Sequence, residues 1–210
     1  MADDPAVQAE ILKLARLLQR EPERLAYLAR LPLNDLKQLR AQVTETLFTD
    51  HEAVLRRLAA ASRLLPVSLV ANLSENTFGP ILSARIAGLM EPERADQVGQ
   101  RLPTRFLADI AIELDPRRVE GVIARIPADR IREITDELAG RQEYVTMGRF
   151  VGHLRDEALA AAINTLSDDD LVETFLVMED PPELDRLARL TDPDRIERLA
   201  ARPGSPIPAP

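Results

Sequence analysis

Side chains that could do chemistry are few in this chain of 210 residues. Cysteine is absent, which excludes thiolate nucleophiles and zinc–thiolate sites, and the two histidines, His51 and His153, lie far apart. No G-x-S-x-G, Walker A or H-E-x-x-H motif is present. We expect His51 to be solvated beside a helix start and His153 to bond a backbone carbonyl, with a place in a cavity as its alternative. We therefore nominate no catalytic residue and predict that the protein is not an enzyme.

An acidic cluster is the candidate for a metal site. Asp168, Asp169 and Asp170, with Glu173, offer the carboxylate oxygens that Mg²⁺ prefers. Consecutive residues on a helix point in different directions, however, and negative charge stabilises a first helical turn. We interpret the cluster as a helix start capped by Ser167 and expect no cofactor, with Mg²⁺ binding as the alternative.

A segment with two glycines is the most distinctive stretch for binding. Gly148 and Gly152 fall within one expected helix, where each glycine costs roughly 1 kcal/mol relative to alanine. Something should therefore approach the helix backbone closely: a neighbouring helix, which we favour, a second protomer, or a ligand. The predicted binding residues of this segment are Tyr144, Arg149, Phe150 and His153.

A polar connector at 72–79 is a second binding candidate. Asn72, Glu75 and Asn76 could donate and accept hydrogen bonds to a partner, although loops are commonly polar because water solvates them. A small-molecule binder or enzyme around Asn72, Glu75 and His153 is the least favoured function.

Proline marks the expected helix starts. It is tolerated in a first helical turn, where its missing N–H would have no intrahelical partner, and it disfavours helix in the preceding residue. The sequence therefore predicts many short helices joined by tight turns. Twelve of the sixteen prolines lie at or beside such starts: positions 5, 22, 32, 66, 80, 92, 103, 116, 127, 181, 182 and 193.

An internal repeat of 24 residues organises the middle of the chain. Pro92 recurs as Pro116, and Leu102-Pro103 recurs as Ile126-Pro127. Each unit fits two short helices. The next matching unit starts 40 residues after Pro116, at Asp156, so the array contains 16 extra residues. We predict that these residues, about 140–155, form an inserted helix.

These patterns divide the chain into three parts. Residues 1–65 are expected to form an N-terminal helical cap or small bundle, and residues 66–200 the repeat array. Residues 201–210, PGSPIPAP preceded by two residues, should be a disordered proline-rich tail. The sequence leaves open whether residues 1–65 dock on the array.

Composition narrows the class of protein. Hydrophobic residues make up 45%, which predicts a folded chain, and only 3% are aromatic. The net charge is −8 and is concentrated in residues 155–210, which disfavours nucleic-acid binding. Arginine outnumbers lysine 25 to 2, which we attribute to genome composition. Neither a signal peptide nor a membrane-spanning run is evident, so we expect a cytoplasmic protein without membrane insertion.

The alternation Glu91-Pro92, Leu102-Pro103, Asp115-Pro116, Ile126-Pro127 resembles the cytosolic N-terminal domain of bacterial MgtE-type magnesium transporters. It is more loosely similar to the armadillo-like segments of the flagellar switch protein FliG. The resemblance covers about residues 66–200 and implies a right-handed superhelix of short α-helices that senses or binds. No metal ligand of that family matches a position here.

The resulting prediction is an all-α superhelix of proline-started helix pairs with an N-terminal cap. We expect a non-enzymatic cytosolic scaffold that binds another protein through its curved surface, with a homodimer left open. A Mg²⁺-responsive regulatory module is the alternative.

Overall fold

The computed structural model describes residues 5–18, 20–49, 52–178, 181–201 and 207, and within them every regular element is helical. No helix of this described part is long and apolar enough to cross a membrane. The predicted all-α class is therefore confirmed.

The N-terminal part contains two long helices and several short ones. Its elements are α1 (Pro5–Leu17), the 3₁₀ helix η1 (Pro22–Arg30), α2 (Leu33–Thr49), α3 (Glu52–Ala61) and the 3₁₀ helix η2 (Ser62–Leu64). We call α1, η1 and α2 the N-terminal hairpin.

The rest of the described chain, which we call the array, is built of short helices. In chain order they are α4 (Val67–Leu73), the π-helical turn η3 (Ser74–Phe78), α5 (Gly79–Ala87), α6 (Pro92–Gly99), α7 (Thr104–Glu113), η4 (Pro116–Arg118), α8 (Glu120–Ile123), α9 (Ala128–Gly140), α10 (Tyr144–Phe150), η5 (Val151–His153), α11 (Asp156–Thr165), α12 (Asp168–Val177), α13 (Pro181–Leu190) and α14 (Pro193–Ala200). All twelve prolines assigned to helix starts lie at or beside one, as predicted.

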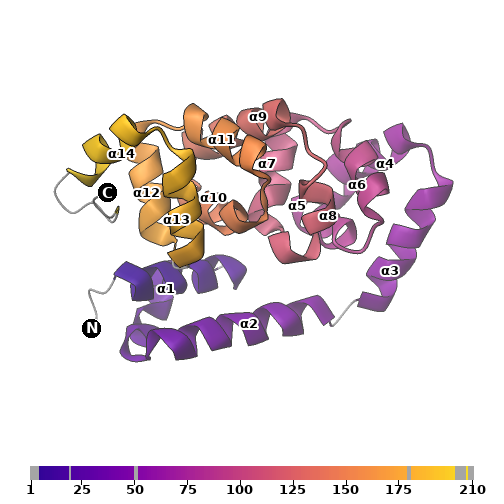
Figure 1. Ribbon diagram of the computed structural model, residues 1–210. Helices are drawn as coiled ribbons and strands as arrows, with labels where there is room; N and C mark the ends of the chain where they lie inside the picture. The colour runs from indigo at the N-terminus through magenta and orange to yellow at the C-terminus, as the bar shows by residue number, and fades with distance from the viewer. Residues whose placement is uncertain (1–4, 19, 50–51, 179–180, 202–206, 208–210) are drawn as a thin grey trace.

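Helices of the array pack in chain order. One row of helices runs along the array, in which α5 packs on α7, α7 on α9, α9 on α11 and α11 on α13. Beside this row, α4 packs against α6 and α6 against α8 (Figure 1). The main core runs through this row and is closed by buried side chains of α11 and α12, among them Leu159, Ile163, Leu171 and Phe175.

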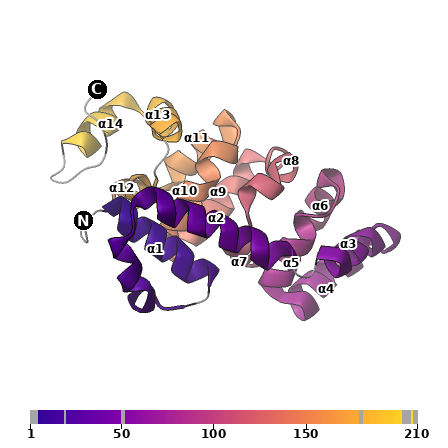
Figure 2. The ribbon, with the colours of Figure 1, turned by 90° about the horizontal axis from the view of Figure 1, so that it is seen from below.

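The N-terminal part meets the array at two separate places. Helix α3 packs against α5 at the start of the array, and α1 packs against α12 near its end. Between these contacts α2 runs beneath the array (Figures 1 and 2). The hairpin keeps a small apolar cluster of its own, formed by Val7, Ile11, Leu14, Ala15, Leu25 and Leu36. The boundary at residue 65 stays a prediction, but residues before it contact both ends of the array.

Three local predictions need correction or completion. The inserted helix is shorter than 140–155: α9 continues to Gly140, a turn with Gln142 at φ 59° follows, and α10 begins at Tyr144. The segment 72–79 is not a loop, because α4 continues through the π-helical turn to Gly79, whose φ of 71° redirects the chain into α5. Most of the tail 201–210 lies outside the described residues, although Ile207 is only 4% exposed and belongs to the main core.

Candidate functional site

A groove of about 1100 Å³ separates the N-terminal hairpin from the array. Its volume exceeds the roughly 300–1000 Å³ typical of small-molecule sites. We call it the basic groove. Its lining comes from α1, α2, α5, the end of α7, the segment 115–119, α10, His153, the end of α12 and Glu183.

Positive side chains outnumber negative ones in the lining of this groove. Seven lysine and arginine residues line it against four aspartates and glutamates, in a chain whose net charge is −8. The basic residues come from both walls: Lys13, Lys37 and Arg40 from the hairpin, and Arg85, Arg117, Arg118 and Arg149 from the array.

Contacts along the array wall orient several of these groups. Arg149 donates to the carbonyl oxygens of Ile112, at 3.4 Å, and Leu114, at the end of α7. The Asp115 carboxylate accepts hydrogen bonds from the Arg117 backbone N–H, at 3.2 Å, and from its guanidinium, at 2.9–3.0 Å. Burial acts to raise the pKa of Asp115, but the hydrogen bonds and charge of Arg117 outweigh it, so the pKa lies below its ordinary value. Asp115 is therefore a carboxylate at neutral pH and caps η4.

Glu113 is the titratable group of the groove whose pKa moves upward. Desolvation by the groove walls raises its pKa, and the Glu143 carboxylate adds to this, while the positive charges of Arg149 and Arg85 oppose it. The net direction is upward. The ionised form of Glu113 is therefore less stable in the groove than in water, although Arg149 and Arg85 lie near it.

A buried carboxylate organises the hairpin wall. Glu10 is 0% exposed, and its Oε2 accepts a hydrogen bond from Arg40 Nε at 2.8 Å, which joins α1 to α2. Its Oε1 lies 3.1 Å from Lys13 Nζ, yet the same atom makes no geometrically acceptable hydrogen bond. We regard this second contact as an ion pair only. Glu10 thereby fixes Lys13 and Arg40 at the edge of the groove.

The structure distributes the four residues predicted on α10 and η5 between the groove and the core. Arg149 and His153 line the groove, and His153 Nδ1 lies 2.9 Å from Glu120 Oε1. Tyr144 donates its hydroxyl to Asp170 Oδ1 at 2.9 Å, and Phe150 packs against the main core. Burial raises the pKa of the Tyr144 phenol, and the Asp170 carboxylate reinforces that shift.

The other predicted binding residues lie elsewhere. Asn72, Glu75 and Asn76 are exposed on α4 and η3 and do not line the groove, and the Asn76 side-chain amide donates to the Asn72 carbonyl at 3.2 Å. The structure therefore does not bring them together with His153. His51 lies outside the described residues.

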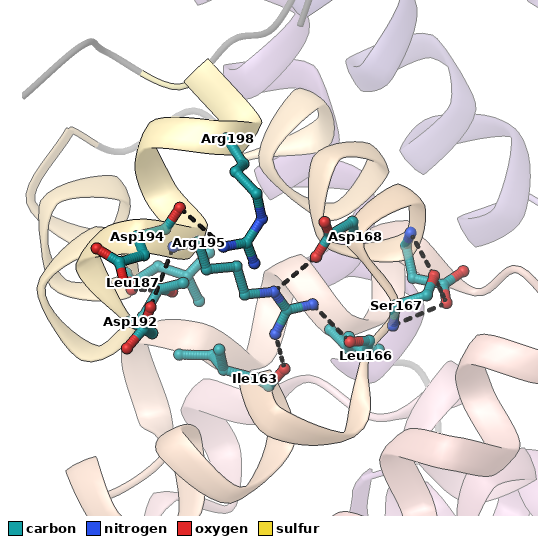
Figure 3. A network of polar contacts seen from close by, with 11 residues as sticks. Ile163, Leu166, Ser167, Asp168, Leu187, Asp192, Asp194, Arg195 and Arg198 are labelled. Carbon is teal, nitrogen blue, oxygen red and sulfur yellow. Dashed lines mark hydrogen bonds and ion pairs between the residues drawn. The ribbon is translucent and has the colours of Figure 1, made fainter. Parts of the chain in front are cut away.

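The acidic cluster forms the start of α12, as its sequence indicates. The Ser167 hydroxyl and the Asp170 carboxylate make a reciprocal capping box, and Asp168 accepts from Arg195 Nε at 2.8 Å (Figure 3). Glu173 is exposed on the same helix. Among the described residues, Asp169 included, no group of three or more acidic, histidine or cysteine side chains is arranged to hold a metal.

Gly148 and Gly152 both face neighbouring helices, which is the approach that we favoured over a second protomer or a ligand. A methyl group on Gly148 would lie 3.2 Å from Met178 Cγ and 3.3 Å from Val177 Cγ2, at the end of α12. A methyl group on Gly152 would collide with the Glu183 carboxylate on α13.

Sequence reasoning missed a recurrent use of arginine. In six places an arginine donates to the last carbonyl groups of a helix 28 to 37 residues earlier in the chain, groups that have no intrahelical partner. The planar guanidinium fork suits this role better than lysine. Part of the arginine excess is therefore structural. These helix-end arginines are Arg94, Arg130, Arg149, Arg155, Arg186 and Arg195.

A second cavity of about 810 Å³ lies among the helices of the array, and most of its lining is apolar core. Its polar rim includes Thr104 and Arg130, and Arg130 donates to Thr104 Oγ1 and Glu133 Oε2, both at 2.6 Å. Arg130, Thr104 and Glu133 therefore supply one another's hydrogen-bond partners. The basic groove is therefore the stronger candidate site.

No protein-family model, curated protein or solved structure matches this chain.

Proposed function

We propose that this protein is a non-enzymatic, cytosolic scaffold that holds another protein in the basic groove of a superhelical helix array. The observation that carries the proposal is the groove itself, which is larger than typical small-molecule sites and lined by two parts of the chain far apart in sequence. The resemblance of the repeat to the cytosolic domain of MgtE-type transporters favours the same kind of role, sensing or binding rather than catalysis. The Mg²⁺-responsive alternative lacks comparable support, because Asp168 and Asp170 are engaged by Arg195, Ser167 and Tyr144.

Site-specific photocrosslinking in the native cells tests this proposal. Leu18 and Ile81 line the groove from α1 and α5 and are 38% and 40% exposed, whereas Leu64 is 87% exposed and lies outside it. A photoreactive phenylalanine analogue at Leu18 or Ile81 should yield one discrete crosslinked protein that the analogue at Leu64 does not yield. Equal crosslinking from all three positions, or none from the groove positions, would contradict the proposal.

A further inference from the structure

The lining of the basic groove specifies the chemistry of what it holds. We infer that its occupant is an amphipathic helix of the partner protein, with acidic residues flanking an apolar stripe. This inference rests on the proposed function and names the kind of partner segment involved.

Charge complementarity is the first argument. Basic side chains reach the groove from both walls, with Lys37 on α2 and Arg85 on α5, while the chain as a whole is acidic. Arg85 is half-buried, and its positive charge attracts the carboxylate of Glu113, whose pKa is raised by desolvation in the groove. An acidic segment would bring a further carboxylate to the positive charge of Arg85. Complementary potentials of this kind direct partner choice and association rate.

Apolar side chains between the basic ones supply the second argument. Leu18 and Ile81 are among the exposed large hydrophobic residues of the described chain, and they face the groove from different walls. Leu17 and Val177 line it as well and are half-buried. A purely acidic chain would leave this apolar surface in water, whereas a helix with apolar residues at three- and four-residue spacing would cover it.

The surrounding architecture favours a helix over an extended strand or a nucleic acid. The described part of the chain is helical and offers no strand edge for an added β-strand, which leaves helix-in-groove binding among the common peptide modes. None of the described residues lining the groove is phenylalanine, tyrosine or tryptophan, so bases would lack stacking platforms there.

A designed peptide tests the inference directly. The probe is a fluorescein-labelled helix of about 14 residues, roughly four turns, with leucine at i, i+3, i+4 and i+7 and glutamate at the flanking positions. Its binding to the full chain is followed by fluorescence anisotropy. We expect saturable binding that weakens as NaCl is raised, and no binding of the same peptide with lysine in place of glutamate.

Charge-reversal variants locate the binding. Lys37→Glu combined with Arg85→Glu should weaken binding of the glutamate peptide by about tenfold or more, because both walls would then repel it. Arg125→Glu and Arg24→Glu together make the same charge change at exposed positions outside the groove and should leave binding unchanged. Equal thermal unfolding midpoints of the two double variants establish that both are folded.

Several outcomes would overturn the inference. They are failure of the glutamate peptide to bind at high micromolar concentration, equal binding of the lysine peptide, displacement of the probe by short single-stranded RNA, and loss of binding on formation of a homodimer through the groove. If the peptide fails while Leu18 and Ile81 still crosslink one protein, the scaffold function stands and the acidic-helix occupant does not. If both fail, the groove is not a protein-binding site.

Discussion

Arg195 on α14 donates from Nε to the Asp168 carboxylate at 2.8 Å and so ties the last helix of the array to the start of α12. The same guanidinium donates to the carbonyls of Ile163, at 2.9 Å, and Leu166, at 2.6 Å, where α11 ends (Figure 3). One side chain thereby satisfies two helix-end carbonyls and the first-turn carboxylate of the next helix. Arg186 on α13 repeats the arrangement one helix earlier, with the carbonyls of Val151 and Leu154 and the carboxylate of Asp156.

Replacing the planar guanidinium of Arg195 by the single ammonium group of lysine should destabilise the array. Arg195→Lys keeps the positive charge but cannot reach all three acceptors, so we expect a loss of about 1–2 kcal/mol in the free energy of unfolding. Urea unfolding followed by circular dichroism measures it. Arg198→Lys, at an exposed residue on the same helix, is the control and should change stability little. Equal effects of the two substitutions would show that the fork geometry is unimportant.

Close packing between repeat units predicts a second effect. A methyl group on Gly121 would lie 2.9 Å from Cγ of Pro92, whose ring cannot swing away. Gly121→Ala should therefore destabilise the protein by about 1 kcal/mol, since the clash exceeds the gain in helix propensity. Gly140→Ala makes the same change where nothing lies within 4 Å and should be neutral or stabilising. Thermal unfolding compares the two, and a stabilising Gly121→Ala would mean that α6 and α8 are not packed as described.

The helices were predictable because their signals are local. Pro92 and Pro116 mark helix starts through their own backbone chemistry, and the capping role of Ser167 needs only Asp170, three residues away. The π-helical turn was missed because the polar run before Gly79 has the composition of a loop, and polarity alone does not distinguish a loop from an exposed helix.

The groove was not predictable, because its walls come from opposite parts of the chain. Periodicity identifies α1 and α5 separately but carries no information that α1 would reach α12, or that Lys37 and Arg85 would line the same groove. Arg149 was singled out for its place in the inserted segment. Its bonds to Ile112 and Leu114, 37 and 35 residues earlier, follow only from the folded arrangement.

The hairpin should be separable from the array by one substitution. Glu10→Ala removes the buried carboxylate that joins Arg40 and Lys13, a change that we expect to cost about 1–3 kcal/mol because both cations are partly exposed. Because the hairpin has its own apolar cluster, we expect amide hydrogen exchange to rise in α1 and α2 while α9 and α11 stay protected. Mass spectrometry of the exchanged peptides measures this.

The control for the hairpin is Glu23→Ala, at an exposed residue of η1, which should leave exchange unchanged. Faster exchange in α9 and α11 of the Glu10→Ala variant would show instead that the hairpin and the array unfold as one unit.

Two glutamates, Glu113 and Glu133, should contribute to the stability of the fold with opposite dependences on pH. The pKa of Glu113 is raised by desolvation, so ionisation disfavours the folded state: its contribution is fully present below the unfolded pKa and is lost as pH rises through the folded pKa. Glu113→Gln cannot ionise, so its stability relative to the unmodified chain should increase from about pH 4 to about pH 7.

Hydrogen bonds from Arg130 and Thr104 lower the pKa of Glu133, so the stability that this residue contributes is present above its unfolded pKa and is lost as pH falls. Glu133→Gln should accordingly lose stability relative to the unmodified chain over the same rise in pH. Urea midpoints across this range measure both differences, and slopes of the same sign would contradict the assigned desolvation of Glu113 in the groove.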